Sequence, residues 1–229
     1  KFISTPESLG TERANNIKIE LDKLNFISPD NHGSQQHNIK DFRRGILDDP
    51  ENFFFSRYSL REFKSEKVDE SLIKRAVALA MKTPSVCNRQ AWHVYHTNDS
   101  EVKEKALKYQ KGNRGFGENI PNLMVITTDL KAFMPGQEHY QHWIDGGLFS
   151  MSIIYALHSL GIASCCLNWS QSPANDQLLR SLVDINPSHT VIMMLAIGLP
   201  DEINNVCTSA RRPIEEVFSQ LQTTESETP

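Results

Sequence analysis

The chain has few cysteines and no long apolar segment. Its 229 residues contain four cysteines, Cys87, Cys165, Cys166 and Cys207, and no two of them form a Cys-x-x-Cys pair. Because the adjacent Cys165 and Cys166 cannot easily bridge each other, we expect free thiols in a reducing, cytoplasmic compartment. No apolar run approaches the roughly 20 residues needed to cross a bilayer, which argues against a membrane-spanning protein.

Basic charge is also scarce. Lysine and arginine number 24 against 28 aspartates and glutamates, which gives a net charge of −4. Nucleic acids and anionic membrane surfaces attract proteins with a basic face, so we expect neither of them as a partner. The chain begins at Lys1 with neither an initiator methionine nor the apolar core of a signal peptide, as expected of a trimmed fragment.

Three common kinds of site are missing from the sequence. There is no Gly-x-Gly-x-x-Gly turn of a Rossmann dinucleotide site and no Walker A lysine loop. His93 and His96 would point to opposite faces of a strand, and His139 and His142 lack an evident third ligand. We therefore predict no metal.

The spacing of apolar residues predicts alternating helices and strands. The predicted helices are Glu12–Leu24, Gln36–Leu47, Val68–Met81, Glu101–Gln110, Gln141–Leu160, Ser172–Val183 and a short one that Pro213 opens. The predicted strands are Trp92–Thr97, Asn122–Thr127, Ile162–Leu167 and Thr190–Ile197. The strand at 122–127 is mostly apolar and should be central. The middle of the helix at 141–160, Leu148–Leu157, is apolar on most sides and should be deeply buried. This order predicts an α+β fold, a three-layer α/β/α arrangement with a mixed sheet.

A polar segment at Ser56–Phe63 is the first candidate for a binding site. It alternates Arg57, Ser59 and Arg61, whose side chains share one face of an extended backbone. Two guanidiniums with a hydroxyl between them suit a phosphate and its neighbouring polyol oxygens. A solvated basic edge strand would have the same pattern.

A second polar segment, Pro84–Trp92, follows about one helix later. Ser85, Asn88 and Gln90 supply neutral hydrogen-bonding groups that suit the edge of a planar ring. Serine and asparagine are equally ordinary in a capping turn, here after a helix that Pro84 stops. Together with the first segment, a phosphate at one end and a ring at the other predict a nucleotide-like cofactor.

The two segments resemble the FMN-dependent nitroreductase family. Its Arg-x-Ser-x-Arg-x-Phe pattern stands at Arg57–Phe63, and its Pro-Ser-x-x-Asn-x-Gln-x-Trp pattern stands at Pro84–Trp92. Looser matches follow in the expected order: Asp145-Gly146-Gly147, Gly161, Gly198-x-Pro200 and Arg211-Arg212-Pro213. The resemblance covers about residues 54–218 and implies a mainly antiparallel sheet flanked by helices.

The resemblance also implies which residues bind FMN. It assigns the phosphate and ribityl chain to Arg57, Tyr58, Ser59, Arg61, Arg211 and Arg212, although Tyr58 stands where the family often carries a second basic residue. It assigns the flavin ring and its polyol to Pro84, Ser85 and Asn88. It assigns Leu167 and Asn168, in a turn after the strand at 162–167, to backbone donors near flavin N5. No catalytic acid or base is assigned.

The implied function is that of a homodimeric oxidoreductase with FMN at the subunit interface. NAD(P)H would give hydride to flavin N5, and a nitroaromatic, quinone or similar planar acceptor would receive it. Two alternatives stay open: reductive dehalogenation or other flavin chemistry on the same fold, and a flavin-binding module without catalysis that serves a partner protein. We expect residues 51–222 to form the flavin-binding domain, 1–50 a helical extension and 223–229 a disordered tail.

Overall fold

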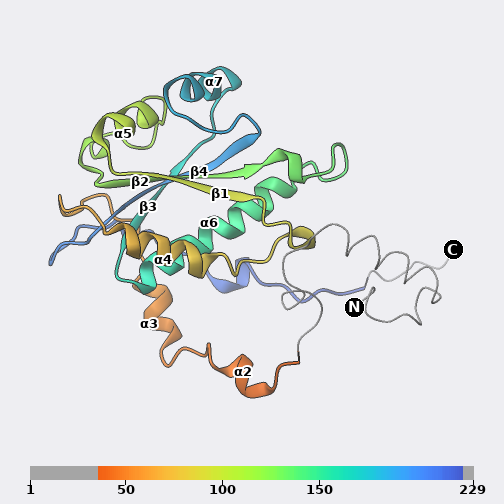
Figure 1. The fold of residues 1–229 in the computed structure, drawn as a ribbon. Coiled ribbons are helices and arrows are strands. Elements are labelled where there is room, and N and C mark those ends of the chain that lie inside the picture. The colour runs from red at the N-terminus through yellow and green to blue at the C-terminus, as the bar shows by residue number, and fades with distance from the viewer. Residues whose placement is uncertain (1–35, 224–229) are drawn as a thin grey trace. The chain divides into compact units, whose positions relative to one another are not determined.

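The computed structural model describes residues 36–223 (Figure 1). The chain divides into two compact units, Lys1–Pro50 and Glu51–Pro229. The described part of the first unit contains the helix α2 (Ile39–Arg43). Asn38 caps this helix, because its side chain accepts a hydrogen bond from the backbone N–H of Lys40 at 2.8 Å.

Helix α2 is shorter than the helix predicted at 36–47. None of its residues is buried, so no packing interaction extends it beyond the capped turn. The other predicted helix of this unit, Glu12–Leu24, lies outside the described residues. A short helix that the spacing of apolar residues does not predict, α3 (Pro50–Phe55), follows, with Pro50 at its first position.

Four strands form one sheet in the order β1 (Trp92–Thr97), β2 (Asn122–Asp129), β4 (His189–Gly198) and β3 (Ala163–Asn168). All three strand pairs are antiparallel. The mostly apolar β2 is central, as its composition predicts. The parallel part of the predicted mixed sheet is, in the described chain, a single bridge between Ser59 and Ser164.

Helices cover both faces of the sheet, which confirms the predicted three layers (Figure 1). Helices α4 (Glu70–Ala80) and α6 (Gln141–Ser159) pack on one face, and α5 (Ser100–Leu107) and α7 (Pro173–Leu182) pack on the other. Alternate residues of β2 separate the two cores: Met124 belongs to the cluster under α6, and Leu123 to the cluster under α5 and α7. The short 3₁₀ turns are η3 (Val86–Asn88), η4 (Gly117–Asn119), η5 (Leu130–Ala132) and η6 (Ile214–Glu216).

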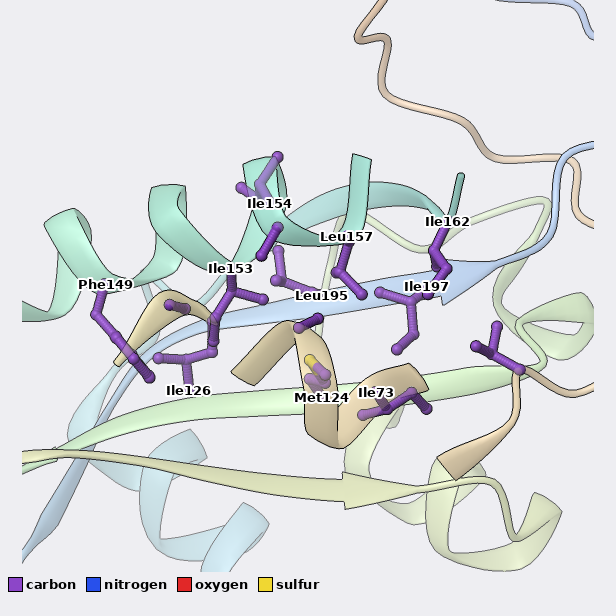
Figure 2. Packing of buried hydrophobic residues seen from close by; sticks show 14 residues of the cluster. Ile73, Met124, Ile126, Phe149, Ile153, Ile154, Leu157, Ile162, Leu195 and Ile197 are labelled. Atoms are coloured by element: carbon purple, nitrogen blue, oxygen red, sulfur yellow. The ribbon is translucent and has the colours of Figure 1, made fainter. Parts of the chain in front are cut away.

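Helix α6 has one buried face and one exposed face. Phe149, Ile153 and Leu157 point toward β2 and β4 and are at most 1% exposed (Figure 2). In contrast, Ile144 and Leu148 are 52% and 46% exposed. The predicted burial of the middle of α6, Leu148–Leu157, is confirmed for most of its residues, and Leu148 is the exception because α4 and the sheet cover the other sides of the helix. None of the helices in residues 36–223 is long and apolar enough to cross a bilayer.

Two neighbouring glycines of α6 should respond differently to alanine. At Gly146 a Cβ atom would lie 2.6 Å from Cγ1 of Ile192, whereas at Gly147 it would meet nothing within 4 Å. We expect Gly146→Ala to lower the free energy of unfolding by about 1–3 kcal/mol through overpacking. Gly147→Ala should be neutral or stabilising by up to about 1 kcal/mol, because alanine favours the helix. Urea denaturation at one protein concentration measures both, and equal stabilities would contradict the close approach of α6 to β4.

Candidate functional site

The arginine segment lies along the edge strand β3. Ser59 forms a parallel bridge with Ser164, and the backbone N–H of Leu60 donates to the Ser164 carbonyl at 3.1 Å. The Leu60 side chain is buried and fixes the segment against the core. Arg57 is half-buried and Arg61 is exposed, so both cationic side chains are held beside the sheet within reach of solvent.

The charges of Arg57 and Arg61 influence two thiols of β3. Burial raises the pKa of Cys165, and the charge of Arg61 opposes that rise. Desolvation of its thiol also raises the pKa of Cys166, although the residue is exposed, and there Arg57 opposes the rise. Neighbouring residues of a strand face opposite sides, so the two arginines influence thiols that point away from each other. Their convergence on one phosphate stays a prediction.

A cavity opens at the start of this segment. It has a volume of about 270 Å³ and is lined by residues that include Arg57, Tyr58, Gly161 and Ser164. A larger cavity of about 910 Å³ lies between α5 and the loop around η4, and none of the predicted site residues lines it. The smaller cavity is therefore the better candidate for the binding site, because predicted site residues line it.

The second segment folds into a tight turn around η3. Cys87, Asn88 and Gln90 adopt left-handed conformations with φ of 49°, 55° and 51°, which are costly for residues other than glycine. The Ser85 hydroxyl stabilises the turn by accepting a hydrogen bond from the Gln90 N–H at 3.0 Å. Ser85 is thus engaged within the turn, whereas Pro84 and Asn88 are exposed.

Asp145 fixes the turn to the start of α6. The residue is 1% exposed, and its carboxylate accepts hydrogen bonds from the Val86 N–H at 3.2 Å and from the Gln141 side chain at 2.8 Å. The left-handed residues raise the conformational free energy of the η3 turn. A buried acceptor for one of the turn's N–H groups helps to offset this cost and to maintain the turn. The Asp-Gly-Gly motif therefore joins two parts of the chain that are 59 residues apart.

Arg89 holds the same turn from the other side. Its Nη1 atom lies 2.5 Å from Oε2 of Glu138 and donates to the Ala132 carbonyl at 3.0 Å. The hydrogen bond within this ion pair raises the pKa of Arg89 and lowers that of Glu138. Neither residue stands out in the sequence, because an ion pair between positions 49 residues apart leaves no local pattern.

Asn168 differs from its predicted place in the turn, whereas Leu167 lies within the predicted strand. Both are residues of β3, paired with Met194 and Met193, and the turn begins only at Trp169. The cause is that the ladder with β4 continues one residue beyond the predicted strand. Leu167 is buried in the core, Asn168 is exposed, and the Asn168 carbonyl accepts a hydrogen bond from the Gln110 side chain at 2.9 Å.

Arg211 and Arg212 lie in the segment after β4, and both are exposed. Arg211 donates a hydrogen bond to the Ser209 carbonyl, and Arg212 lies 3.9 Å from Glu216. Among the hydrogen bonds and ion pairs of residues 36–223, none joins them to residues 57–61. The helix predicted after Pro213 is only the 3₁₀ turn η6, which is too short to form a helical N-terminus for a phosphate.

The hydrogen-bond donors of these residues are of the chemical types that FMN requires. Guanidiniums at 57 and 61 suit a phosphate, and the Ser59 hydroxyl and Asn88 amide suit a polyol and a ring edge. Across the described residues there is no group of three or more histidine, cysteine, aspartate or glutamate side chains placed to hold a metal.

Comparison with known proteins agrees with the motifs. Residues 55–113 match the model of the nitroreductase family. An NADPH-dependent oxidoreductase of Staphylococcus saprophyticus is 27% identical over 184 residues, which cover 73% of this chain and 71% of the relative. An iodotyrosine deiodinase of Nematostella vectensis is 22% identical over 191 residues, 71% of each chain.

A solved structure confirms the fold. An FMN-dependent nitroreductase from Clostridium difficile superposes with a TM-score of 0.63 at 20% identity, covering 75% of this chain and 99% of its own. The matched family segment contains both of the predicted cofactor motifs. Over residues 55–113 the chain is therefore similar to the nitroreductase family, and it shares the fold of a solved member.

Proposed function

We propose that the chain is an FMN-dependent oxidoreductase that takes hydride from NAD(P)H and reduces a small planar acceptor, such as a nitroaromatic or a quinone. The observation that supports it most is that both cofactor motifs fall inside the matched family segment and that Arg57 lines a cavity beside β3. The names of an NADPH-dependent relative and of an FMN-dependent structural neighbour point the same way.

The side chains around the site have binding and orienting roles in this proposal. FMN, when bound, supplies the hydride chemistry. Arg57 and Arg61 hold its phosphate, Ser59 its polyol and Asn88 its ring edge, while the buried Asp145 keeps the η3 turn in the shape that presents Asn88. No side chain is required as an obligate acid or base.

The apolar surface supports a homodimer. Ile144 and Leu148 on α6 are about half exposed, and Ile203 and Leu221 in the segment after β4 are 87% and 97% exposed. Contiguous exposed apolar surface marks interaction sites, and Ile144 and Leu148 are neighbours one turn apart on α6. We propose that a second copy of the chain covers them, with FMN at the interface. Sedimentation of the FMN-loaded protein tests this, and a fully active monomer would contradict it.

The first test of the function is an absorption spectrum of the purified protein. We expect a yellow protein that releases FMN in near-equal amount to the chain, identified by chromatography after denaturation. Anaerobic NADH or NADPH should then bleach the visible band, and an added quinone should restore it. A protein that neither contains nor takes up FMN would refute the proposal.

Two outcomes would favour the alternative functions. The relative named iodotyrosine deiodinase makes reductive dehalogenation the second candidate. Release of halide from a halogenated phenol in preference to quinone reduction would favour that activity. Binding of FMN without reduction by either nicotinamide cofactor would favour a flavin-binding module that serves a partner protein.

A further inference from the structure

We propose that the ion pair between Arg89 and Glu138 fixes segment 132–138 as one wall of the acceptor site and thereby sets which acceptors react. Neither residue is a fixed position of the two cofactor motifs. The proposal rests on the proposed function, because it concerns the acceptor of that same site. Its physical basis is a set of contacts between two loops that are far apart in the sequence.

The segment between β2 and α6 is closed on itself by Glu138. The carboxylate accepts a hydrogen bond from the Met134 N–H at 2.7 Å, and the Glu138 N–H donates to the Met134 carbonyl at 3.2 Å. Arg89 adds bonds to the Ala132 carbonyl and to the Glu138 carboxylate. A single guanidinium therefore holds both ends of segment 132–138.

The ion pair is partly shielded from water. The side chains of Arg89 and Glu138 are 27% and 19% exposed, so either charge would lose solvation without its partner. A paired, multiply bonded guanidinium has one preferred geometry. The pair is thus suited to keep the two loops at a constant separation.

Arg89 also stands between the left-handed residues Asn88 and Gln90. A shift of the Arg89 side chain would therefore displace the backbone of the η3 turn. Asn88 in that turn is the proposed contact to the flavin ring. On the other loop, Met134 and Tyr140 present exposed apolar surface, 51% and 69% exposed, which suits contact with a planar acceptor. The ion pair therefore couples the proposed ring-binding turn to an apolar wall.

A matched control exists on the opposite side of the sheet. Arg180 pairs with Asp176 at 2.6 Å, with side chains 21% and 31% exposed, and it also donates to the carbonyls of Asn186 and His189. Arg180→Met removes a comparable ion pair and comparable carbonyl contacts without touching segment 132–138. Arg89→Met is the test variant.

Two measurements compare these variants with the wild type. The first is the rate of chymotrypsin cleavage within residues 132–140, with the sites identified by mass spectrometry. The second is the ratio of kcat/KM for a one-ring and a two-ring quinone at saturating NAD(P)H, with KM and kcat determined separately. We expect faster cleavage and a change of about 3- to 30-fold in the ratio, carried mainly by KM, in Arg89→Met alone.

Conservative variants separate charge from bulk. Arg89→Lys keeps the charge and should lie between the wild type and Arg89→Met, because a lysine cannot reproduce the planar guanidinium contacts. Glu138→Gln keeps an oxygen for the Met134 N–H and should change the ratio in the same direction as Arg89→Met. It also serves as the test if Arg89→Met does not fold.

The outcomes distinguish this proposal from the function on which it rests. Unchanged cleavage or an unchanged ratio in an FMN-loaded, active Arg89→Met would overturn the role of the ion pair and leave the proposed function intact. An equal change in Arg180→Met would overturn it as well, because the effect would then reflect general destabilisation. A wild-type protein that binds no FMN would refute both.

Discussion

Replacing Arg57 and Arg61 together by alanine should weaken FMN binding by about two to four orders of magnitude. A hydrogen bond to a charged group contributes about 1.5–3 kcal/mol, and 1.4 kcal/mol corresponds to a factor of ten in affinity. Each single variant should lose about ten- to hundredfold. The measurement is a titration of FMN followed by quenching of its fluorescence, at fixed ionic strength because screening affects phosphate contacts.

An arginine outside both motifs provides the control. Arg75 lies exposed on α4, outside both motifs, so Arg75→Ala should bind FMN as the wild type does. Lysine at 57 or 61 should restore part of the affinity, because it keeps the charge but not the paired N–H groups of a guanidinium. Wild-type affinity in the double alanine variant would show that the phosphate is held elsewhere. Arg211→Ala would then be the next variant to measure.

Much of the fold could be predicted because its elements carry strong local signals. The strand at Trp92–Thr97 has the predicted bounds, and α7 begins at Pro173, one residue after the predicted start at Ser172. The central place of β2 follows from its apolar sequence, since a strand covered on both faces has no polar side. Where such a signal was absent, as in α2, which has no buried residue, the predicted helix was too long.

The edge of the site was harder to predict, because it depends on contacts across the sheet. The register of β3 against β4 extends the strand to Asn168, which places that residue in the ladder and not in the predicted turn. Pairing between strands fixes such an end, and a single sequence does not contain it. The same holds for the short parallel bridge that brings Ser59 beside Ser164.

The η3 turn can be predicted from its side chains, but its backbone conformation cannot. Serine and asparagine predict a turn after Pro84, and the structure has one. Its three left-handed residues, however, are maintained by Asp145 from α6 and by the pair of Arg89 with Glu138. These supports come from positions 49 and 59 residues away, so local patterns cannot reveal them.

The apolar character of α6 has two physical origins that its sequence does not separate. Phe149 and Ile153 are apolar because they form the core beneath the helix, whereas Ile144 and Leu148 are apolar on a face that the described chain leaves exposed. A helix that is apolar all round is normally buried on all sides. The proposed second copy of the chain would remove this conflict, because it would cover the exposed face.

Replacing Phe149 by alanine should lower the free energy of unfolding by about 3–5 kcal/mol, the range for a large aromatic residue lost from a core. Phe149 is 1% exposed and stacks on Trp92 with ring centroids 4.6 Å apart and planes 7° apart. The variant would leave a cavity between α6 and β1 and would also remove this ring contact. Guanidinium denaturation at a fixed protein concentration measures the change, and Trp92 fluorescence should shift at the same time.

The control is a helical residue of similar character outside the core. Leu178 on α7 is 42% exposed, so Leu178→Ala should cost less than about 1 kcal/mol. A loss below about 1 kcal/mol in Phe149→Ala as well would mean that α6 does not pack on β1 in solution as it does here. Because Asp145 on the same helix holds the η3 turn, such a result would also remove the structural basis for placing Asn88 at the cofactor site.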